Sequence, residues 1–269
     1  MTDTLSPAPD FLEMSDGRRI AYHKLKGRCD AAQPGIVFLG GFKSDMTGTK
    51  AVALERWAAA RGRAFLRFDY TGHGASSGDF LDGCIGDWAR DAKDAVDALT
   101  EGPQILVGSS MGGWISLILA RASAQFGGRV AGLATIAAAP DFTADSMEAS
   151  FTEAQKAEMA ETGRIELPSD YSDEPYVITA KLIEDGRNHL VLRDPLSLPF
   201  PVRMMQGTAD TDVPQERALI LLSHIACPDL RLNLVKGADH RFSEPREIAI
   251  LGETLDELTR ACAAAAGAG

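Results

Sequence analysis

The sequence is poor in the features that mark several classes of protein. Its 269 residues include four cysteines, Cys29, Cys84, Cys227 and Cys262, which lie too far apart to form a paired metal or redox motif. Basic residues are in the minority, with 27 Lys and Arg against 38 Asp and Glu and a net charge of −11. Because polyanions are bound through an excess of basic residues, we expect no nucleic-acid partner. We also expect no metal site.

Long hydrophobic runs are missing as well. The longest purely apolar stretches, such as 136–140 and 219–222, are far short of the ~20 residues needed to cross a bilayer. Residues 1–7 contain neither a basic segment nor an apolar core of the secretory type. We therefore expect no integral membrane segment, and the unpaired cysteines together with the missing leader predict a cytoplasmic location.

The sequence does contain an alternation of apolar runs and amphipathic segments. Residues 88, 92, 95, 96 and 99, for example, recur at the spacing of one helix face. This alternation predicts an α/β fold with a mostly parallel, eight-stranded sheet flanked by helices. The predicted strands are 11–15, 18–25, 36–39, 64–70, 105–107, 130–139, 202–206 and 230–235.

One interval breaks the alternation. Between about residues 141 and 199 no strand is predicted, whereas 145–161 and 176–188 have helical patterns. We interpret 141–199 as a helical cap insertion. The remaining segments, 11–140 and 200–265, then form a single core domain.

The clearest chemical motif is the segment 108–113, Gly-Ser-Ser-Met-Gly-Gly, which follows a predicted strand and precedes a predicted helix. A G-x-S-x-G sequence in this context is typical of a nucleophile elbow. Gly108 and Gly112 remove side chains that would collide in the sharp turn, and the turn directs the hydroxyl of Ser110 above the sheet. We therefore predict Ser110 as a nucleophile.

A serine hydroxyl needs a base to take its proton, and five histidines are candidates. His23 lies in the N-terminal hairpin and His224 in an amphipathic helix, so both are interpreted as structural, and His73 lies in a glycine-rich turn that we assign to the scaffold. His189 lies in the predicted cap, where it could line a pocket. His240 follows the last strand, at the same sheet edge as the nucleophile, and is the predicted base.

The base needs a carboxylate that fixes its tautomer and stabilises the imidazolium. Asp210 follows the strand 202–206 closely and is the favoured acid, with Asp212 as the rival. Asp212 could instead cap the helix that follows. Asp239 is disfavoured because a residue cannot easily orient the ring of its immediate neighbour.

An oxyanion that forms during acyl transfer requires preorganised donors. The backbone N–H of Met111 adjoins the nucleophile, and the N–H of Phe42 follows the strand 36–39 across Gly40-Gly41. These two N–H groups are the predicted oxyanion hole. The alternative for 40–42 is an ordinary strand-to-helix turn.

Several segments resemble a known family. The chain order Ser110, Asp210, His240 is that of the α/β-hydrolase superfamily, which the sequence resembles from about residue 11 to 263. More specifically, it is similar to the abhydrolase-domain group of acyl-glucuronide esterases and palmitoyl-protein thioesterases. The mitochondrial targeting of that group is not expected here, because no Arg-rich segment precedes the domain. The segments that carry the closer resemblance are 46–51, 67–72, 102–114, 167–172 and 239–241.

The resemblance implies Ser110 as nucleophile, Asp210 as acid and His240 as base, which agrees with the choice made from the residues. It also implies small-molecule or S-acyl/O-acyl ester substrates. We therefore expect a serine hydrolase that cleaves carboxylic ester or thioester bonds through an acyl-enzyme on Ser110, without a cofactor or a metal.

Two kinds of alternative stay open at this point. A carbon–carbon bond hydrolase or a cofactor-free perhydrolase would use the same three residues. A catalytically silent binding protein on the same fold is the non-enzymatic alternative, and such proteins usually lack one of the three. The motifs give no information on acyl chain length, leaving group or oligomeric state.

Overall fold

The computed structural model describes residues 8–30, 32–123, 128–168 and 175–267. Residues 1–7, on which the expectation of a missing leader rested, and residues 169–172 of the resemblance segment 167–172 lie outside the described residues.

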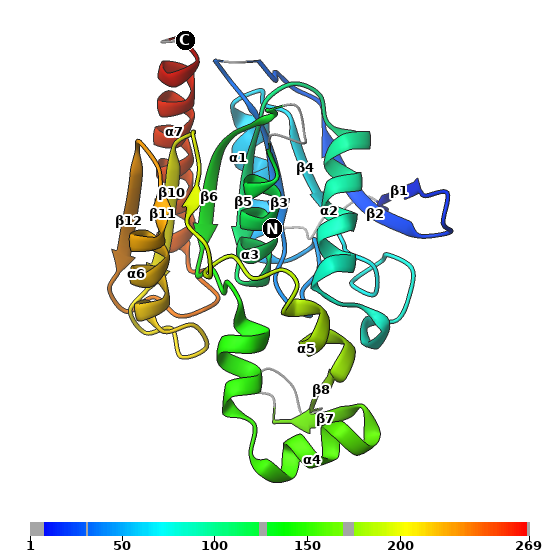
Figure 1. Ribbon diagram of the computed structural model, residues 1–269. Helices are drawn as coiled ribbons and strands as arrows, with labels where there is room; N and C mark the ends of the chain where they lie inside the picture. Colours follow the sequence, from blue (N-terminus) through cyan, green and yellow to red (C-terminus); the bar gives the residue numbers. More distant parts are fainter. Residues whose placement is uncertain (1–7, 31, 124–127, 169–174, 268–269) are drawn as a thin grey trace.

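The centre of the protein is an eight-stranded sheet with the strand order β1-β2-β4-β3-β5-β6-β10-β12 (Figure 1). The pairs β1–β2 and β2–β4 are antiparallel and every later pair in the sheet is parallel. The predicted eight-stranded, mostly parallel sheet is confirmed. Its strands are β1 (Asp10–Glu13), β2 (Arg19–Leu25), β3 (Gly35–Leu39), β4 (Phe65–Phe68), β5 (Gln104–Ser109), β6 (Val130–Ile136), β10 (Val202–Gly207) and β12 (Leu230–Val235).

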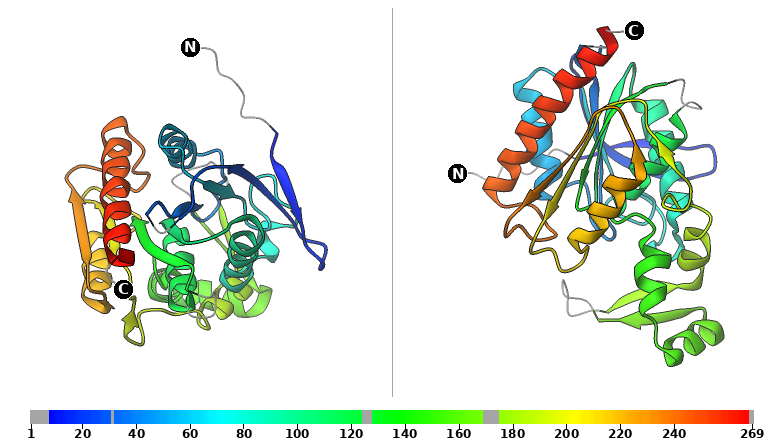
Figure 2. Two further views of the ribbon diagram at one scale, coloured as in Figure 1. Left: turned by 90° about the horizontal axis from the view of Figure 1, so that it is seen from above. Right: turned by 60° about the vertical axis from the view of Figure 1, so that its left-hand side comes forward.

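Helices cover both faces of the sheet (Figure 2). Helices α1 (Thr49–Ala60) and α7 (Pro245–Gly267) pack on one face, and α2 (Ile85–Leu99), α3 (Met111–Arg121) and α6 (Gln215–His224) pack on the other. Strands β3 and β5 are buried along their whole length, as expected for strands covered on both sides. Their continuous apolar runs were therefore a reliable sequence signal.

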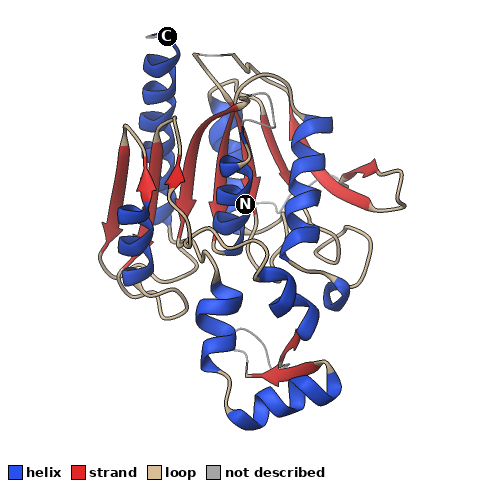
Figure 3. Cartoon of the chain, in the orientation of Figure 1, coloured by secondary structure: helices blue, strands red, loops and turns tan. Residues whose placement is uncertain are grey.

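Residues 141–199, which we call the inserted segment, extend from the end of the sheet at which β6 finishes (Figure 1). Figure 3 shows that this segment contains both helices and strands. It consists of a π-helix η3 (Thr143–Glu148), α4 (Glu153–Thr162), β7 (Arg164–Leu167), β8 (Tyr176–Thr179), α5 (Ala180–Gly186) and β9 (Leu196–Ser197), the last pairing with β11 (Ile225–Ala226).

The expectation that this interval is purely helical is wrong. Strands β7 and β8 pair in an antiparallel ladder, and the side chains of Ile165 and Ile178 are buried in the hydrophobic core cluster. Tyr176–Thr179, which we predicted as the start of a helix, is a short run of aromatic and β-branched residues, the composition that favours a strand. Four residues are too few for a period of two to be distinguished from a helical period.

Candidate active site

Ser110 lies at the sharp turn between β5 and α3. Its backbone has φ 54° and ψ −118°, a strained conformation for a residue other than glycine. The turn is held by two hydrogen bonds: the Ser110 N–H donates to Ile136 O at 2.9 Å, and the Ala139 N–H donates to Ser110 O at 3.1 Å. The strain is thus maintained by the end of the neighbouring strand β6.

Two glycines make this turn possible. A Cβ atom at Gly112 would lie 2.1 Å from the carbonyl oxygen of Leu39, and one at Gly108 would lie 2.3 Å from that of Gly112. Both separations are far below van der Waals contact, so neither position accepts a side chain. Because both positions are glycine, the backbone can approach this closely, and α3 can begin at Met111, the residue that follows Ser110.

The structure brings the three predicted side chains together from three different loops. His240 Nε2 lies 3.1 Å from Ser110 Oγ, and His240 Nδ1 lies 2.9 Å from Asp210 Oδ2. Since the Asp210 carboxylate only accepts hydrogen bonds, Nδ1 carries the ring proton and the lone pair of Nε2 faces the serine hydroxyl. The side chain of Asp210 is fully buried and that of His240 is 19% exposed. This is the arrangement that general-base activation of a serine requires.

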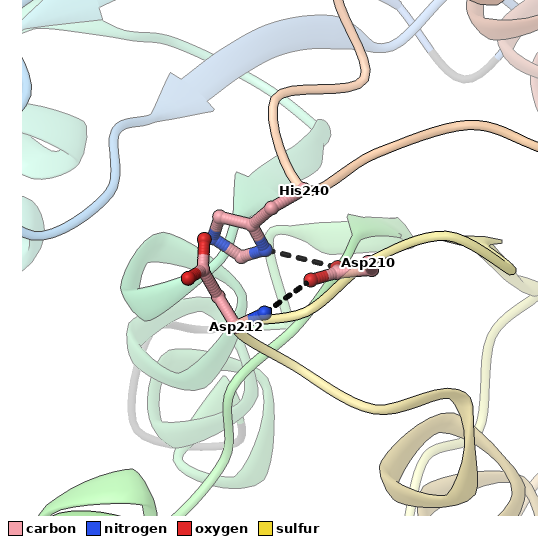
Figure 4. A group of neighbouring side chains, drawn as sticks. All are labelled: Asp210, Asp212 and His240. Carbon is pink, nitrogen blue, oxygen red and sulfur yellow. Dashed lines mark hydrogen bonds and ion pairs between the residues drawn. The ribbon is translucent and has the colours of Figure 1, made fainter. Parts of the chain in front are cut away.

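The choice between Asp210 and Asp212 depends on the backbone. Asp210 Oδ1 accepts a hydrogen bond from the Asp212 N–H (3.0 Å), while Oδ2 faces His240 (Figure 4). Oδ1 also accepts from the N–H of Val213 (2.8 Å). Asp212 is exposed. The N-cap position of α6 is occupied by Pro214 rather than by Asp212. The hydrogen-bonding position next to the imidazole is therefore that of Asp210.

The ionisation of Asp210 reflects two opposing effects. Burial disfavours its charged form, but hydrogen bonds from His240, Val213 and Gln206 outweigh burial and lower the pKa of the carboxyl below its usual value. Asp210 is therefore a carboxylate at neutral pH, able to stabilise a positive charge on the ring of His240.

The two predicted oxyanion donors belong to segments that adjoin Ser110. Met111 is the first residue of α3, so its N–H has no partner within the helix. The N–H of Phe42 donates to no acceptor among the described residues. A Cβ atom at Gly41 would lie 3.4 Å from the Cβ of Ser110, which places the 40–42 turn directly against the serine.

The other four histidines are engaged away from Ser110. His23 is part of β2, His73 Nδ1 lies 3.3 Å from Thr71 O, and His224 Nε2 lies 2.6 Å from Asp194 O. His189, which we expected could line a pocket, pairs instead with Asp185 at 3.4 Å. These four side chains do not line the cavity beside Ser110.

A cavity of about 550 Å³ opens beside Ser110. Its lining includes apolar and aromatic side chains as well as charged and hydroxyl side chains. The apolar residues are Phe38, Phe42, Ala51, Ala139, Pro140, Phe142, Met147, Tyr176, Val213 and Pro214. The polar residues include Lys43, Asp45, Lys50, Asp212, Arg217, Arg241 and Ser243.

Phe42 connects the predicted oxyanion turn with the inserted segment. Its ring packs against Phe142 (5.9 Å between centroids) and Tyr176 (6.0 Å) of that segment, and against Phe80 (4.9 Å) and Trp88 (5.9 Å) of the sheet domain. The position of one wall of the cavity is therefore fixed by the same cluster that holds the oxyanion turn.

Two features of the site were not apparent from the sequence pattern. Gln206, within β10, donates from Nε2 to Asp210 Oδ2 at 2.9 Å; a polar residue in a fully buried strand was an available signal. Lys50 donates to the carbonyl oxygen of Arg241, next to the histidine, and burial lowers the pKa of its ammonium to about 8. No short motif predicts a contact between residues so distant in the sequence.

Within the described part of the chain, one group of side chains has the spacing of a metal site. Asp210, Asp212 and His240 have oxygen and nitrogen atoms within 4.8 Å of one another. However, both ring nitrogens of His240 already face Asp210 and Ser110. A metal ion here would have to displace one of these contacts.

Residues 36–250 match the α/β hydrolase family, and the chain belongs to that family. It is a hydrolase, as the sequence predicted. Among its relatives, the mouse protein named palmitoyl-protein thioesterase ABHD10, mitochondrial, is 39% identical over 249 residues, which cover 92% of this chain and 81% of the relative.

Two solved structures resemble this one closely. A putative hydrolase from Agrobacterium vitis S4 has a TM-score of 0.87 and 39% identity, covering 94% of this chain and all of the other. Alpha/beta hydrolase domain-containing protein 10 from mouse has a TM-score of 0.84 and 37% identity, covering 93% of this chain and 98% of the other.

These comparisons contradict one prediction. The expected cytoplasmic location is wrong when judged by the mouse relative, which is named as mitochondrial. That prediction depended on the unpaired cysteines and on the composition of the first residues, and neither is strong evidence of a location. Separately, none of the described helices combines the length and the apolar character needed to cross a membrane.

Proposed function

We propose that the protein hydrolyses acyl esters or thioesters, with Ser110 as nucleophile, His240 as general base and Asp210 as the acid that orients it. The observation that carries this proposal is the continuous chain of contacts from Ser110 Oγ through both nitrogens of His240 to Asp210 Oδ2, at 3.1 and 2.9 Å. Family membership adds that the fold is one on which such chemistry is carried out.

In this mechanism, His240 Nε2 takes the proton of Ser110 Oγ as the oxygen attacks the carbonyl carbon of the substrate. The oxyanion that forms is held by the N–H groups of Phe42 and Met111. The imidazolium of His240, stabilised by Asp210, then protonates the departing alkoxide or thiolate, which leaves an acyl ester on Ser110. Water, deprotonated by the same nitrogen, cleaves that ester and releases the carboxylic acid.

The lining of the cavity supports an acyl group as the recognised part of the substrate. Phe142, Met147 and Tyr176 form an apolar wall beside Ser110, and such walls bind alkyl chains by excluding water. The mouse relative is named as a thioesterase that acts on palmitoyl-protein. We therefore place the acyl chain along these three residues and the leaving group toward the polar side.

Phe142, Met147 and Tyr176 all belong to the inserted segment. Their position in the cavity supports a division of the chain into a core, 11–140 and 200–265, and a cap formed by the inserted segment, 141–199. The cap supplies the apolar wall, and its two ends are joined at Asp141, whose carboxylate accepts the N–H groups of Val191 (2.8 Å) and Leu192 (3.0 Å). Asp141 is completely buried. We propose that this junction holds the cap over the nucleophile.

The test is labelling with a fluorophosphonate, which reacts with activated serines. The wild-type protein is expected to be labelled on Ser110, and Ser110→Ala to lose both label and esterase activity. Ser146→Ala is the matched control, because Ser146 also lines the cavity but has no role in the mechanism, and it should be labelled normally. His240→Gln and Asp210→Asn should lower kcat by roughly 10³–10⁶ and 10³–10⁴-fold. Full activity in Ser110→Ala would refute the proposal.

Substrate class is tested with acyl p-nitrophenyl esters of increasing chain length, measured beside the matching acyl thioesters. If the apolar wall holds the chain, kcat/KM should rise with chain length until the wall is covered, since each buried methylene contributes about 0.8 kcal/mol. A preference for acetyl esters over all longer ones would contradict the proposed placement.

A further inference from the structure

Gln206 is an unusual residue for its place in the fold. It lies in β10, a strand whose six residues are all buried, and its own exposure is 1%. Strands covered on both faces are normally built from apolar residues, so a primary amide at this point needs a specific reason. The strand ends at Gly207, three residues before Asp210.

The orientation of the Gln206 amide is determined by its neighbours. Its nitrogen Nε2 lies 2.9 Å from Asp210 Oδ2 and 2.9 Å from the carbonyl oxygen of Val213. Both partners can only accept hydrogen bonds, so the NH₂ group must face them. The carbonyl oxygen Oε1 then points elsewhere, and it is buried without a hydrogen-bond partner among the described residues. A buried, unpaired acceptor is destabilising, which argues against a role in stability alone.

The two hydrogen bonds connect the strand to the loop that carries the acid. Oδ1 of Asp210 is held by the N–H groups of Asp212 and Val213. Oδ2 is held by His240 Nδ1 and by Gln206 Nε2. Gln206 is thus the second donor to the oxygen that orients the histidine, and its bond to Val213 O fixes the far end of the same loop.

We propose that Gln206 is a positioning residue for the reaction, which keeps Asp210 Oδ2 directed at His240 Nδ1. This inference rests on the proposed function of the Ser110, His240 and Asp210 group. When His240 is protonated, a carboxylate that is already held in place can stabilise the imidazolium without moving. A carboxylate held only through Oδ1 would have to reorganise at each turnover.

Three variants separate positioning from packing. Gln206→Leu has a similar volume and removes both donors. Gln206→Glu is isosteric; as a neutral acid it can donate one hydrogen bond to Asp210, and as an anion it repels Asp210. Met205→Leu, at the buried neighbouring position whose side chain packs on the opposite face of the sheet, is the matched control for repacking the strand.

We expect Gln206→Leu to lower kcat and the rate of fluorophosphonate labelling by about 10-fold, with KM and the melting temperature near the wild-type values. Met205→Leu should keep the wild-type kcat. A wild-type kcat and labelling rate in Gln206→Leu would overturn the inference, and so would an equal loss in Met205→Leu, because that loss would be one of packing.

The pH profile of Gln206→Glu supplies a readout that a purely structural role would not change. The charged groups near this amide are Asp210, Asp212 and His240 at the sheet edge, with Lys50 of α1 also interacting with Asp210. The kcat/KM of Gln206→Glu relative to wild type should fall as pH rises and the introduced acid ionises. The ratio for Gln206→Leu should stay constant with pH. A constant ratio for Gln206→Glu overturns the inference even if Gln206→Leu fails to fold.

The Ser110→Ala variant makes the two proposals distinguishable. If Ser110→Ala retains activity, the proposed function fails, and with it the basis of this inference. If Ser110→Ala is inactive and the Gln206 variants behave like wild type, only the role of Gln206 is refuted.

Discussion

His73 provides a sensitive test of how burial controls ionisation in this fold. Its side chain is 4% exposed and lies 5.1–5.5 Å, centroid to centroid, from the rings of Tyr70, Phe80 and Trp88. Its Nε2 atom is buried with no hydrogen-bond partner among the described residues. Burial lowers the pKa of His73 to about 4, because a protonated ring would bring an unpaired N–H and a positive charge into this aromatic cluster.

The consequence for stability has a definite sign. In the unfolded chain the histidine has its ordinary pKa of about 6.5, so between pH 6.5 and 4 the unfolded state binds the proton and the folded state does not. The contribution of His73 to the free energy of unfolding is therefore complete above about pH 6.5 and is lost as the pH falls toward 4. The full difference is about 3 kcal/mol, and roughly 2 kcal/mol of it is lost between pH 7 and pH 5.

The assay is urea unfolding at these two pH values, for the wild type and for His73→Phe, which keeps an aromatic ring but cannot be protonated. On going from pH 7 to pH 5, the wild type should lose about 2 kcal/mol more than the variant. In a second measurement, the ring protons of His73 followed by NMR should stay those of a neutral imidazole at pH 5. An identical pH dependence of both proteins, or a His73 that titrates near 6.5, would refute the reasoning.

Three further variants test other parts of the structure. Gly112→Ala, whose Cβ would lie 2.1 Å from a carbonyl oxygen of β3, should abolish fluorophosphonate labelling and lower the melting temperature; normal labelling would show that the elbow has room for a side chain. Asp141→Asn replaces one of the two oxygens that accept the N–H groups of Val191 and Leu192. It should lower stability by about 1–3 kcal/mol and speed proteolysis within 141–199, and unchanged cleavage would exclude the proposed junction. Phe142→Ala should lower kcat/KM about 10-fold on a dodecanoyl ester while leaving an acetyl ester nearly unaffected, whereas equal losses on both would place the acyl chain elsewhere.

The parts of the fold that the sequence predicted correctly are those determined by local signals. The eight strands of the sheet correspond to apolar or alternating runs, and the G-x-S-x-G turn stands between a buried strand and a helix in the structure as in the prediction. The β7–β8 hairpin was missed because each of its strands has four residues. Strands this short do not show a period.

The residues of the site could not all be predicted from local sequence patterns, because their roles depend on contacts made in the folded loops. Asp210 and Asp212 are two residues apart and have the same side chain, so spacing could favour one of them but could not decide. Their difference comes from the loop backbone, which turns the N–H groups of Asp212 and Val213 onto Asp210 Oδ1. The contact of Gln206 with Asp210 was not predicted for a similar reason, since it exists only once the loop has folded back over the end of β10.

The loop after β6 connects Ser110 with the inserted segment, which contributes Phe142, Met147 and Tyr176 to the cavity. On one side, Ile136 and Ala139 hold the strained backbone of Ser110 through two hydrogen bonds. On the other side, Asp141, itself at a left-handed φ of 58°, binds the end of the inserted segment at Val191. Residues 136–141 thus link the Ser110 turn to the proposed junction at Asp141. A movement of the inserted segment that broke the Asp141 contacts would free the same loop that maintains the Ser110 conformation, so an ordered wall and an activated serine are expected to depend on each other.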